Sequence, residues 1–261
     1  MSPIDFESFA LELAGVAAKE TLPGFRRDLV IVDKGEGSGF DPVTAADRNA
    51  EAALRQAIAA RLPDHGVIGE EYGEDRADAA WVWVLDPIDG TRAYVSGLPL
   101  WATLIALLHD GEPVLGVVAQ PYLQEVFIGT RAGSRLMRPD VADRPLRTRA
   151  CPSLAEATIS TTDPALFVGE EAEAWSRLRG TARLARLGCD AYAYAMVAAG
   201  QVDVVLESGL KLWDWAAHKP LIEGAGGAVS GWDRGSCDDG RVLAVGKPGL
   251  TAAVQMTLRA K

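Results

Sequence analysis

The segment Asp86-Pro87-Ile88-Asp89-Gly90-Thr91 constrains this chain most, because it closes the apolar run from Trp81 to Leu85. The run predicts a buried strand, and the proline and glycine predict a turn at its end. Asp86 and Asp89 can then lie on one side of that turn, where their oxygens suit a hard cation such as Mg²⁺. A turn that leads toward a helix also offers the backbone N–H groups of Gly90 and Thr91 to a phosphate. Taken alone, the segment would equally fit a surface turn whose acids only bond the backbone.

Acidic residues stand next to apolar or aromatic residues at two further places in the chain. Glu70 and Glu71 come just after Val67 and Ile68, and Asp214 lies between two tryptophans. Each place has a structural alternative, because the glutamates could form an exposed acidic turn and the aspartate could cap a helix. Glu70 and Asp86 thus both stand where apolar strands are expected to end.

The composition is typical of a soluble enzyme, since 48% of the 261 residues are hydrophobic and 24% are charged. The length predicts one large domain or two closely packed ones. A net charge of -10 argues against a nucleic-acid partner, because a protein that binds nucleic acid needs clustered Lys and Arg. An acidic protein can still bind a phosphate where a metal ion makes the local charge positive. No signal peptide or membrane span is expected, so the prediction is a cytoplasmic protein with no membrane partner. The cysteines are expected to be reduced and structural.

Hydrophobic periodicity and turn residues predict an alternation of helices and strands along the chain. The first half is expected to contain helices at 6–18 and 44–62, a loop at 34–40, and strands at 67–68, 81–85, 100–108 and 113–118. The second half is expected to contain strands at 154–160 and 202–206 and helices at 170–179, 191–199 and 213–224. Residues 129–152 are rich in Arg, Pro and Asp and predict a weakly structured connection between two regions. These are an N-terminal α+β region, residues 1–140, and a C-terminal α/β region, residues 141–261.

Several motifs together resemble the inositol monophosphatase superfamily of metal-dependent phosphatases. They are Asp41-Pro-Val-Thr-Ala-Ala-Asp47, Gly69-Glu-Glu71, Trp83-Val-Leu-Asp-Pro-Ile-Asp-Gly-Thr91, Trp213-Asp-Trp-Ala-Ala217 and Glu223-Gly-Ala-Gly-Gly227. Their order and separations also resemble those of the family, and they cover nearly the whole chain. The resemblance implies a layered αβαβα sandwich in which the α+β region supplies most metal ligands and the α/β region completes the metal and substrate site.

The resemblance also implies two Mg²⁺ ions that share one carboxylate. The first ion would be held by Glu70, Asp86 and the carbonyl of Ile88, and the second by Asp86, Asp89 and Asp214. A third ion near Glu70 and Glu71 is implied as well. Such ions remove the repulsion between a phosphate dianion and its attacking oxygen.

The nucleophile that the family implies is a water held by the metal and oriented by the residues that match Thr91 and Asp47. Asp47 has a structural alternative, because Thr44 and Asp47 have the spacing of a helix capping box. Both roles can coexist. The histidines fall outside the matched positions, so histidine catalysis is not expected.

Within the superfamily, the run from Gly90 to Pro99 resembles the histidinol-phosphatase branch, mainly through Arg92 and Ser96-Gly97. Histidinol phosphate carries an ammonium and an imidazole, so acids outside the metal core are candidates for binding these groups of the substrate. Asp190 and Glu207 are the predicted substrate contacts, and Arg92 is a further candidate. The alternatives are that Asp190 only begins a helix and that Glu207 is a solvated acid at a strand end.

The resulting prediction is a Mg²⁺-dependent enzyme that hydrolyses histidinol phosphate, a small phosphate monoester, to histidinol and phosphate. Three alternatives stay open: an inositol-1-phosphate phosphatase, a nucleotide 3′-phosphatase and a divalent-cation-binding protein without catalysis. The acidic Asp190 and Glu207 disfavour the nucleotide, which would need a pocket for a second phosphate and a base. Homodimers are common among such proteins, and the sequence alone proves none.

Overall fold

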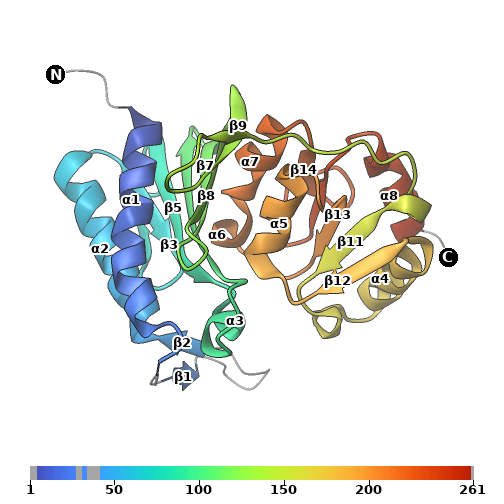
Figure 1. Ribbon diagram of the computed structural model, residues 1–261, viewed down its shortest axis with the longest axis horizontal. Coiled ribbons are helices and arrows are strands. Elements are labelled where there is room, and N and C mark those ends of the chain that lie inside the picture. Colours follow the sequence, from blue (N-terminus) through green and yellow to red (C-terminus); the bar gives the residue numbers. More distant parts are fainter. Residues whose placement is uncertain (1–4, 28–30, 34–41, 260–261) are drawn as a thin grey trace.

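The computed structural model describes residues 5–27, 31–33 and 42–259 of the 261-residue chain. The loop predicted at 34–40 and Asp41 of the first motif lie outside the described residues. Within the described part, helices and sheets alternate in five layers (Figure 1). This arrangement confirms the αβαβα sandwich that the resemblance implied.

Helices form the two outer layers and the middle layer (Figure 1). From the first outer layer to the last they are α1 (Phe6–Thr21) and α2 (Ala45–Arg61), then α5 (Asp190–Ala198), α6 (Leu212–Trp215) and α7 (His218–Gly224), then α4 (Glu170–Thr181) and α8 (Leu250–Arg259). The predicted helices at 6–18, 44–62, 170–179 and 191–199 correspond to α1, α2, α4 and α5.

Two large sheets separate the helical layers. Among the described residues, the first has eight strands in the order β10 (Arg144–Pro145), β9 (Gly133–Met137), β8 (Glu125–Thr130), β7 (Glu112–Gln120), β6 (Ala102–His109), β5 (Trp81–Asp89), β3 (Gly66–Gly69) and β4 (Gly73–Asp75). The second, in the same described part, has five in the order β12 (Leu184–Leu187), β11 (Thr158–Thr161), β13 (Val204–Glu207), β15 (Val242–Val245) and β14 (Ala228–Gly231). A small separate ladder pairs β1 (Ile31–Asp33) with β2 (Pro42–Thr44).

Strand β5 shows how the sequence builds the layers. Successive side chains of a strand point to opposite faces of the sheet. Trp83 and Leu85 accordingly pack with α1 and α2, whereas Val82 and Val84 pack with the middle helices. Because both faces are buried, the strand is apolar from Trp81 to Leu85, and the acids Asp86 and Asp89 come only in its last part.

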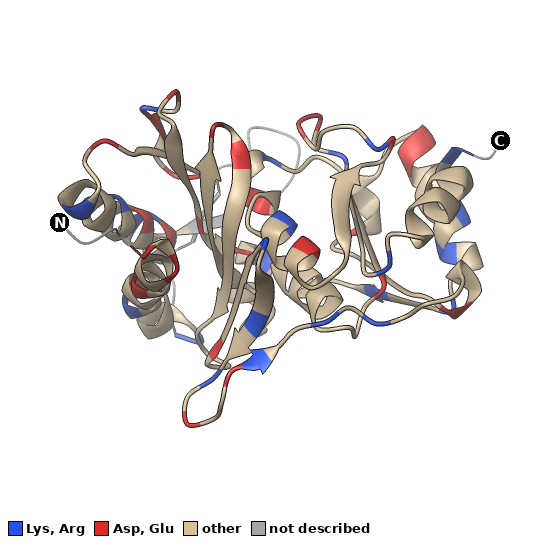
Figure 2. Cartoon of the chain, turned by 90° about the horizontal axis from the view of Figure 1, so that it is seen from above, with Lys and Arg blue, Asp and Glu red and all other residues tan. Residues whose placement is uncertain are grey.

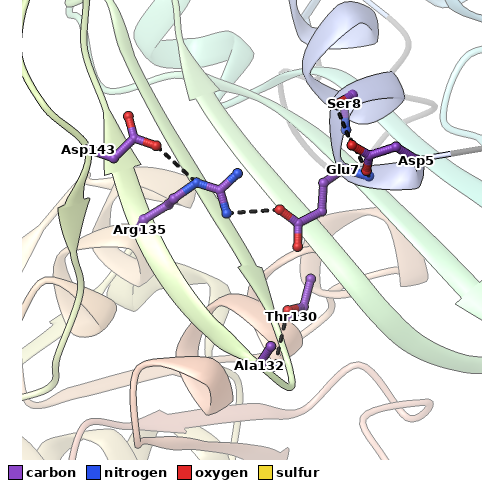
Figure 3. A network of polar contacts seen from close by, with 7 residues as sticks. All are labelled: Asp5, Glu7, Ser8, Thr130, Ala132, Arg135 and Asp143. Carbon is purple, nitrogen blue, oxygen red and sulfur yellow. Dashed lines mark hydrogen bonds and ion pairs between the residues drawn. The ribbon is translucent and has the colours of Figure 1, made fainter.

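The connection predicted at 129–152 is wrong in part, because β9 and β10 extend the first sheet through it. Ser134 and Leu136 are buried while Arg135 between them is half-buried, so a period of two is present despite the charged residues. Arg135 ion-pairs with Glu7 in α1 and with Asp143, which ties this edge of the sheet to the first helix (Figure 3). The division of the chain at residue 140 stays a prediction.

The helix predicted at 213–224 is also wrong, because it is interrupted between α6 and α7. Pro220 lacks the N–H that would bond to the carbonyl of Ala216, and its ring would clash with that carbonyl. The break lets α7 lie closely on the first sheet, where a Cβ at Gly116 would stand 1.9 Å from the carbonyl oxygen of Ala217. The strand predicted at 154–160 begins only at Thr158, after a short 3₁₀ turn at Leu154–Glu156.

Charged residues are interspersed over both halves of the described chain (Figure 2). No helix in the described ranges has the length and apolar character needed to span a bilayer.

Candidate active site

Three carboxylates from distant parts of the chain meet at the end of β5. One oxygen each of Asp86, Asp89 and Asp214 lies within 4.8 Å of the others. Residues three apart in a regular strand point to opposite faces, but the register of β5 against β6 shifts between these two aspartates, which allows both to reach one site. The N–H of Ile88 donates to Asp86 Oδ1 over 3.1 Å, and Asp214 Oδ2 accepts from the N–H of Lys211 over 2.6 Å.

The electrostatics of this cluster fit a bound cation. Burial, followed by repulsion from Glu70, Asp89 and Asp214, raises the pKa of Asp86 well above its ordinary value. Burial and the charge of Asp214 do the same to the pKa of Asp89. Burial raises the pKa of Asp214 to about 6, although the N–H and charge of Lys211 oppose the shift. Buried carboxylates at such distances ionise together only when a positive charge offsets their repulsion, and their oxygens suit a hard divalent metal.

Glu70 reaches the same cluster because β3 and β5 run parallel. Their carboxyl ends therefore coincide, and the N–H of Glu70 continues the ladder by donating to the Leu85 carbonyl over 3.3 Å. The charge of Glu70 is second only to burial in raising the pKa of Asp86. Glu71 lies nearer α2, where its Oε2 is 3.7 Å from Arg48 Nε.

Asp47 forms the capping box that its spacing from Thr44 predicted. Its Oδ2 accepts from the Thr44 N–H over 2.9 Å and from the Thr44 hydroxyl over 2.6 Å. Burial raises the pKa of Asp47, the bonds from Thr44 lower it, and the charge of Glu71 raises it further. The charge of Asp47 also contributes to the raised pKa of Asp86. Asp47 is thus a helix cap within electrostatic reach of the cluster, and its catalytic role stays a proposal.

Thr91 begins the short helix α3 (Thr91–Val95), directly after Gly90 with a positive φ of 83°. Its hydroxyl donates to the carbonyl of Ile88 over 3.1 Å, which is the carbonyl that the resemblance assigns to the metal. A carbonyl oxygen has two lone pairs, so it can accept the hydroxyl and still bind a cation. A side chain at Gly90 would be strained by its φ, and its Cβ would lie 3.0 Å from the Cβ of Asp190.

A cavity of about 260 Å³ joins the cluster to the predicted substrate contacts. Its walls come from both halves of the chain, and they consist of Asp89, Gly90, Thr91, Arg92, Thr162, Leu166, Asp190, Ala191, Tyr194, Glu207, Leu210 and Asp214. A larger cavity of about 620 Å³ beside α4 and α8 contains none of the residues predicted for the site. The chemistry of the lining therefore identifies the smaller cavity as the candidate active site.

The backbone at Asp190 is shaped so that the following N–H bonds to the acid cluster. Its φ is positive at 41°, and the next N–H, of Ala191, donates to Asp89 Oδ1 over 2.9 Å. Burial raises the pKa of Asp190 to about 6, with the Thr162 hydroxyl and the charge of Arg92 opposing the shift. Arg92 Nη1 also lies 3.9 Å from Asp163 Oδ2, at the exposed side of the cavity.

Glu207 is buried at the end of β13, so its interpretation as a solvated acid is wrong. Its carboxylate accepts from the Thr161 hydroxyl over 3.1 Å, and from the Thr162 N–H and hydroxyl over 2.7 and 3.0 Å. Burial raises the pKa of Glu207 to about 7 despite these bonds. A carboxyl with that pKa gains from a cationic neighbour.

Two polar residues of the cavity were not singled out by sequence reasoning. The Thr162 hydroxyl donates to Glu207 and lowers the pKa of Asp190, and the polar pair Thr161-Thr162 at the end of β11 was a signal for it. Tyr194 lines the cavity, and within the described part of the chain its buried hydroxyl has no hydrogen-bond partner. No pattern of spacing marks Tyr194 as different from a core aromatic.

Behind the cavity, His218 stacks on Tyr194 with ring centroids 4.2 Å apart, and burial lowers the pKa of His218 to about 3 from 6.5. The unfolded chain gains this proton below pH 6.5 but the folded protein does not, so acidification removes stability, by up to about 1.4 kcal/mol per pH unit. We expect His218→Leu to abolish this contribution. Urea unfolding of both proteins from about pH 7 to 4.5 should show wild type losing stability relative to the variant as pH falls. A difference that stays constant with pH would contradict the expectation.

A five-layer sandwich with three converging carboxylates, one buried and two half-buried, beside a small polar cavity defines the class of metal-dependent phosphatases. The chain belongs to the inositol monophosphatase family, whose family profile matches residues 4–260.

Relatives within this family carry more than one substrate name. The chain is 43% identical to the chloroplastic bifunctional phosphatase IMPL2 of Arabidopsis thaliana over 89% of its own length and 66% of that protein, just under two thirds. It is 37% identical to a histidinol-phosphatase of Chlorobaculum parvum, over 84% of the chain and 82% of that protein. It is 35% identical to an inositol-1-monophosphatase of Mesorhizobium japonicum, over 90% of both.

Solved structures support the same fold. An inositol monophosphatase from Zymomonas mobilis superposes with a TM-score of 0.87 at 38% identity, covering 99% of this chain and 100% of that one. The chain is therefore a phosphoric monoester hydrolase that depends on a divalent metal, and its substrate is the open question.

Proposed function

We propose that this protein is a Mg²⁺-dependent phosphatase that hydrolyses histidinol phosphate to histidinol and phosphate. The observation that carries the proposal is one cavity in which Asp89 and Asp214 of the acid cluster share the walls with Asp190 and Glu207. The first pair suits a metal-bound phosphate, and the second suits a positively charged alcohol.

The metal ligands in this proposal are the residues that the motifs predicted. Two Mg²⁺ ions would be held by Glu70, Asp86, the Ile88 carbonyl, Asp89 and Asp214, with Asp86 shared, and a third would lie near Glu70 and Glu71. When bound, such ions supply an activated water and stabilise the leaving oxygen. The protein itself positions that water through the Thr91 hydroxyl and the Asp47 carboxylate. The N–H groups of Gly90 and Thr91, at the start of α3, bind phosphoryl oxygens.

Substrate choice is proposed to depend on Asp190 and Glu207. Both are acids that burial holds at raised pKa values, so a cation beside them would be favoured and a neutral polyol would not be. Arg92, whose charge lowers the pKa of Asp190, is a further substrate contact at the rim of the cavity. The relatives named histidinol-phosphatase support this choice. The relatives named inositol-1-monophosphatase support inositol 1-phosphate as the second candidate.

A panel of phosphate monoesters tests these alternatives directly. We expect phosphate release from histidinol phosphate to exceed release from inositol 1-phosphate and a nucleotide 3′-phosphate, and to vanish when Mg²⁺ is chelated. A preference for inositol 1-phosphate would replace the proposed substrate, and no release from any ester would favour a cation-binding protein. A cytoplasmic location and a homodimer belong to the proposal too, and gel filtration tests the second.

Neutralising the two acids should alter specificity more than basal hydrolysis. We expect Asp190→Asn and Glu207→Gln each to lower kcat/KM for histidinol phosphate by about 10- to 100-fold, because a charge-assisted hydrogen bond is lost. The value for inositol 1-phosphate should change far less. The measurement is the ratio of the two kcat/KM values.

Glu125→Gln provides the matched control for this experiment. Glu125 is also a buried acid that accepts a hydroxyl, from Tyr192, but it lies outside the cavity. Its substitution should leave the ratio unchanged. Equal losses on both substrates in the Asp190 and Glu207 variants would remove the chemical basis for histidinol phosphate.

A further inference from the structure

Glu51 is a buried acid that the proposed mechanism does not use. It lies one turn after Asp47 in α2, and its side chain is fully buried. A buried carboxylate without partners would be strongly destabilising, so its partners indicate what it does.

The partners of Glu51 belong to the turn that follows β3. Its Oε2 accepts from the N–H of Glu71 over 2.7 Å, and its Oε1 accepts from the N–H of Tyr72 over 3.2 Å. Arg55, one helical turn further on, donates to Oε1 over 2.8 Å and also donates to the carbonyl of Gly73. One carboxylate and its arginine therefore hold three consecutive residues by their backbone, Glu71 and Tyr72 in this turn and Gly73 at the start of β4.

The end of β3 is shaped to admit this carboxylate. A Cβ at Gly69 would stand 2.1 Å from Glu51 Oε1, so only glycine leaves room there. Glu70 lies between Gly69 and the residues held by Glu51, and its own N–H is bonded to Leu85 in β5. The backbone on both sides of Glu70 is thus fixed, on one side by the sheet and on the other by Glu51.

We propose that Glu51 is a positioning residue that presents Glu70 and Glu71 to the metal site. The inference rests on the proposed function for the identity of the metal and for Glu70 and Glu71 as its ligands. Because α2 carries both Asp47 and Glu51, the same helix would hold the water-orienting acid and the turn with two proposed ligands. Groups that hold metal ligands in this way typically contribute about 10- to 100-fold to metal affinity.

Glu51→Gln tests the proposal, because the amide replaces one acceptor oxygen by a donor that faces a backbone N–H. In the metal-free protein we expect the amides of Glu71 and Tyr72 to exchange with solvent at least about tenfold faster, since a bond to a charged acceptor is lost. In a calorimetric titration the variant should bind Mg²⁺ about 10- to 100-fold more weakly. Unchanged exchange, or faster exchange with unchanged Mg²⁺ affinity, would overturn the proposal.

Gly69→Ala provides a second variant that keeps Glu51 but displaces its carboxylate. It should therefore reproduce both the faster amide exchange and the weaker Mg²⁺ binding.

Leu178→Ala provides the control for a general loss of stability, because Leu178 is fully buried in the outer core of the second sheet. It should leave both the turn amides and the Mg²⁺ affinity unchanged. Failure of the proposed function is distinguishable, because it would show in wild type as no phosphate release and no Mg²⁺ binding.

Discussion

Asp86→Asn is expected to lower Mg²⁺-dependent turnover by about 10³-fold or more, because the carboxylate that two cations are proposed to share loses its charge. Asp86 is buried and within reach of the charges of Glu70, Asp89 and Asp214, so no other group of the cluster occupies an equivalent place. The measurement is turnover across a Mg²⁺ titration.

The same substitution should have the opposite effect on the metal-free protein. Without a cation, Asp86 is a buried acid that neighbouring acids repel, and removing its charge should increase the free energy of unfolding. Stabilisation by added Mg²⁺ should then be much smaller than in wild type. Asp110→Asn, in the exposed turn between β6 and β7, is the control and should change neither property. Near-normal turnover of the Asp86 variant would refute the site assignment.

Thr91→Ala should give the second largest loss, a decrease in kcat of about 10²-fold with little change in KM. The hydroxyl is held on the Ile88 carbonyl beside the acid cluster, where it is proposed to orient the attacking water. An effect on KM alone would instead assign Thr91 to substrate binding.

Asp47→Asn separates the capping role of this acid from its proposed catalytic role when it is compared with Thr44→Ala. Both variants weaken the capping box and should cost about 0.5–2 kcal/mol of stability. Only Asp47→Asn removes the charge near the cluster, so turnover should fall much further in it. Equal and small losses of turnover would leave Asp47 with the capping role alone.

Much of the acid cluster could be predicted because its signals are local. An apolar run that ends in Asp86-Pro-Ile-Asp89-Gly90 indicates a strand, a turn and two oxygen ligands within a few residues. The parallel partner of that strand ends in Glu70, so the carboxyl ends of both strands meet at one edge. The capping box at Thr44 and Asp47 is equally local.

Other features depend on segments that meet only in the folded protein. The break between α6 and α7 was signalled by Pro220, although one continuous helix was predicted across it. Strand β9 carries Arg135, whose ion pairs are made with Glu7 of α1 and with Asp143, outside the sheet. Tyr194 of α5 and Thr162 after β11 become cavity residues only when these segments meet Asp89 and Gly90 around one cavity.

The sequence by itself determined the donor types, their order along the chain and the turns that present them, because these follow from residue chemistry over a few bonds. Only the tertiary structure decided that Asp214 reaches Asp86, that Glu51 is fully buried against the turn carrying Glu70, and that Glu207 is buried beside Thr162. The physical reason is that burial and close approach are set by the packing of whole layers. The pKa values and partners of these acids arise from neighbours that are far away in the sequence.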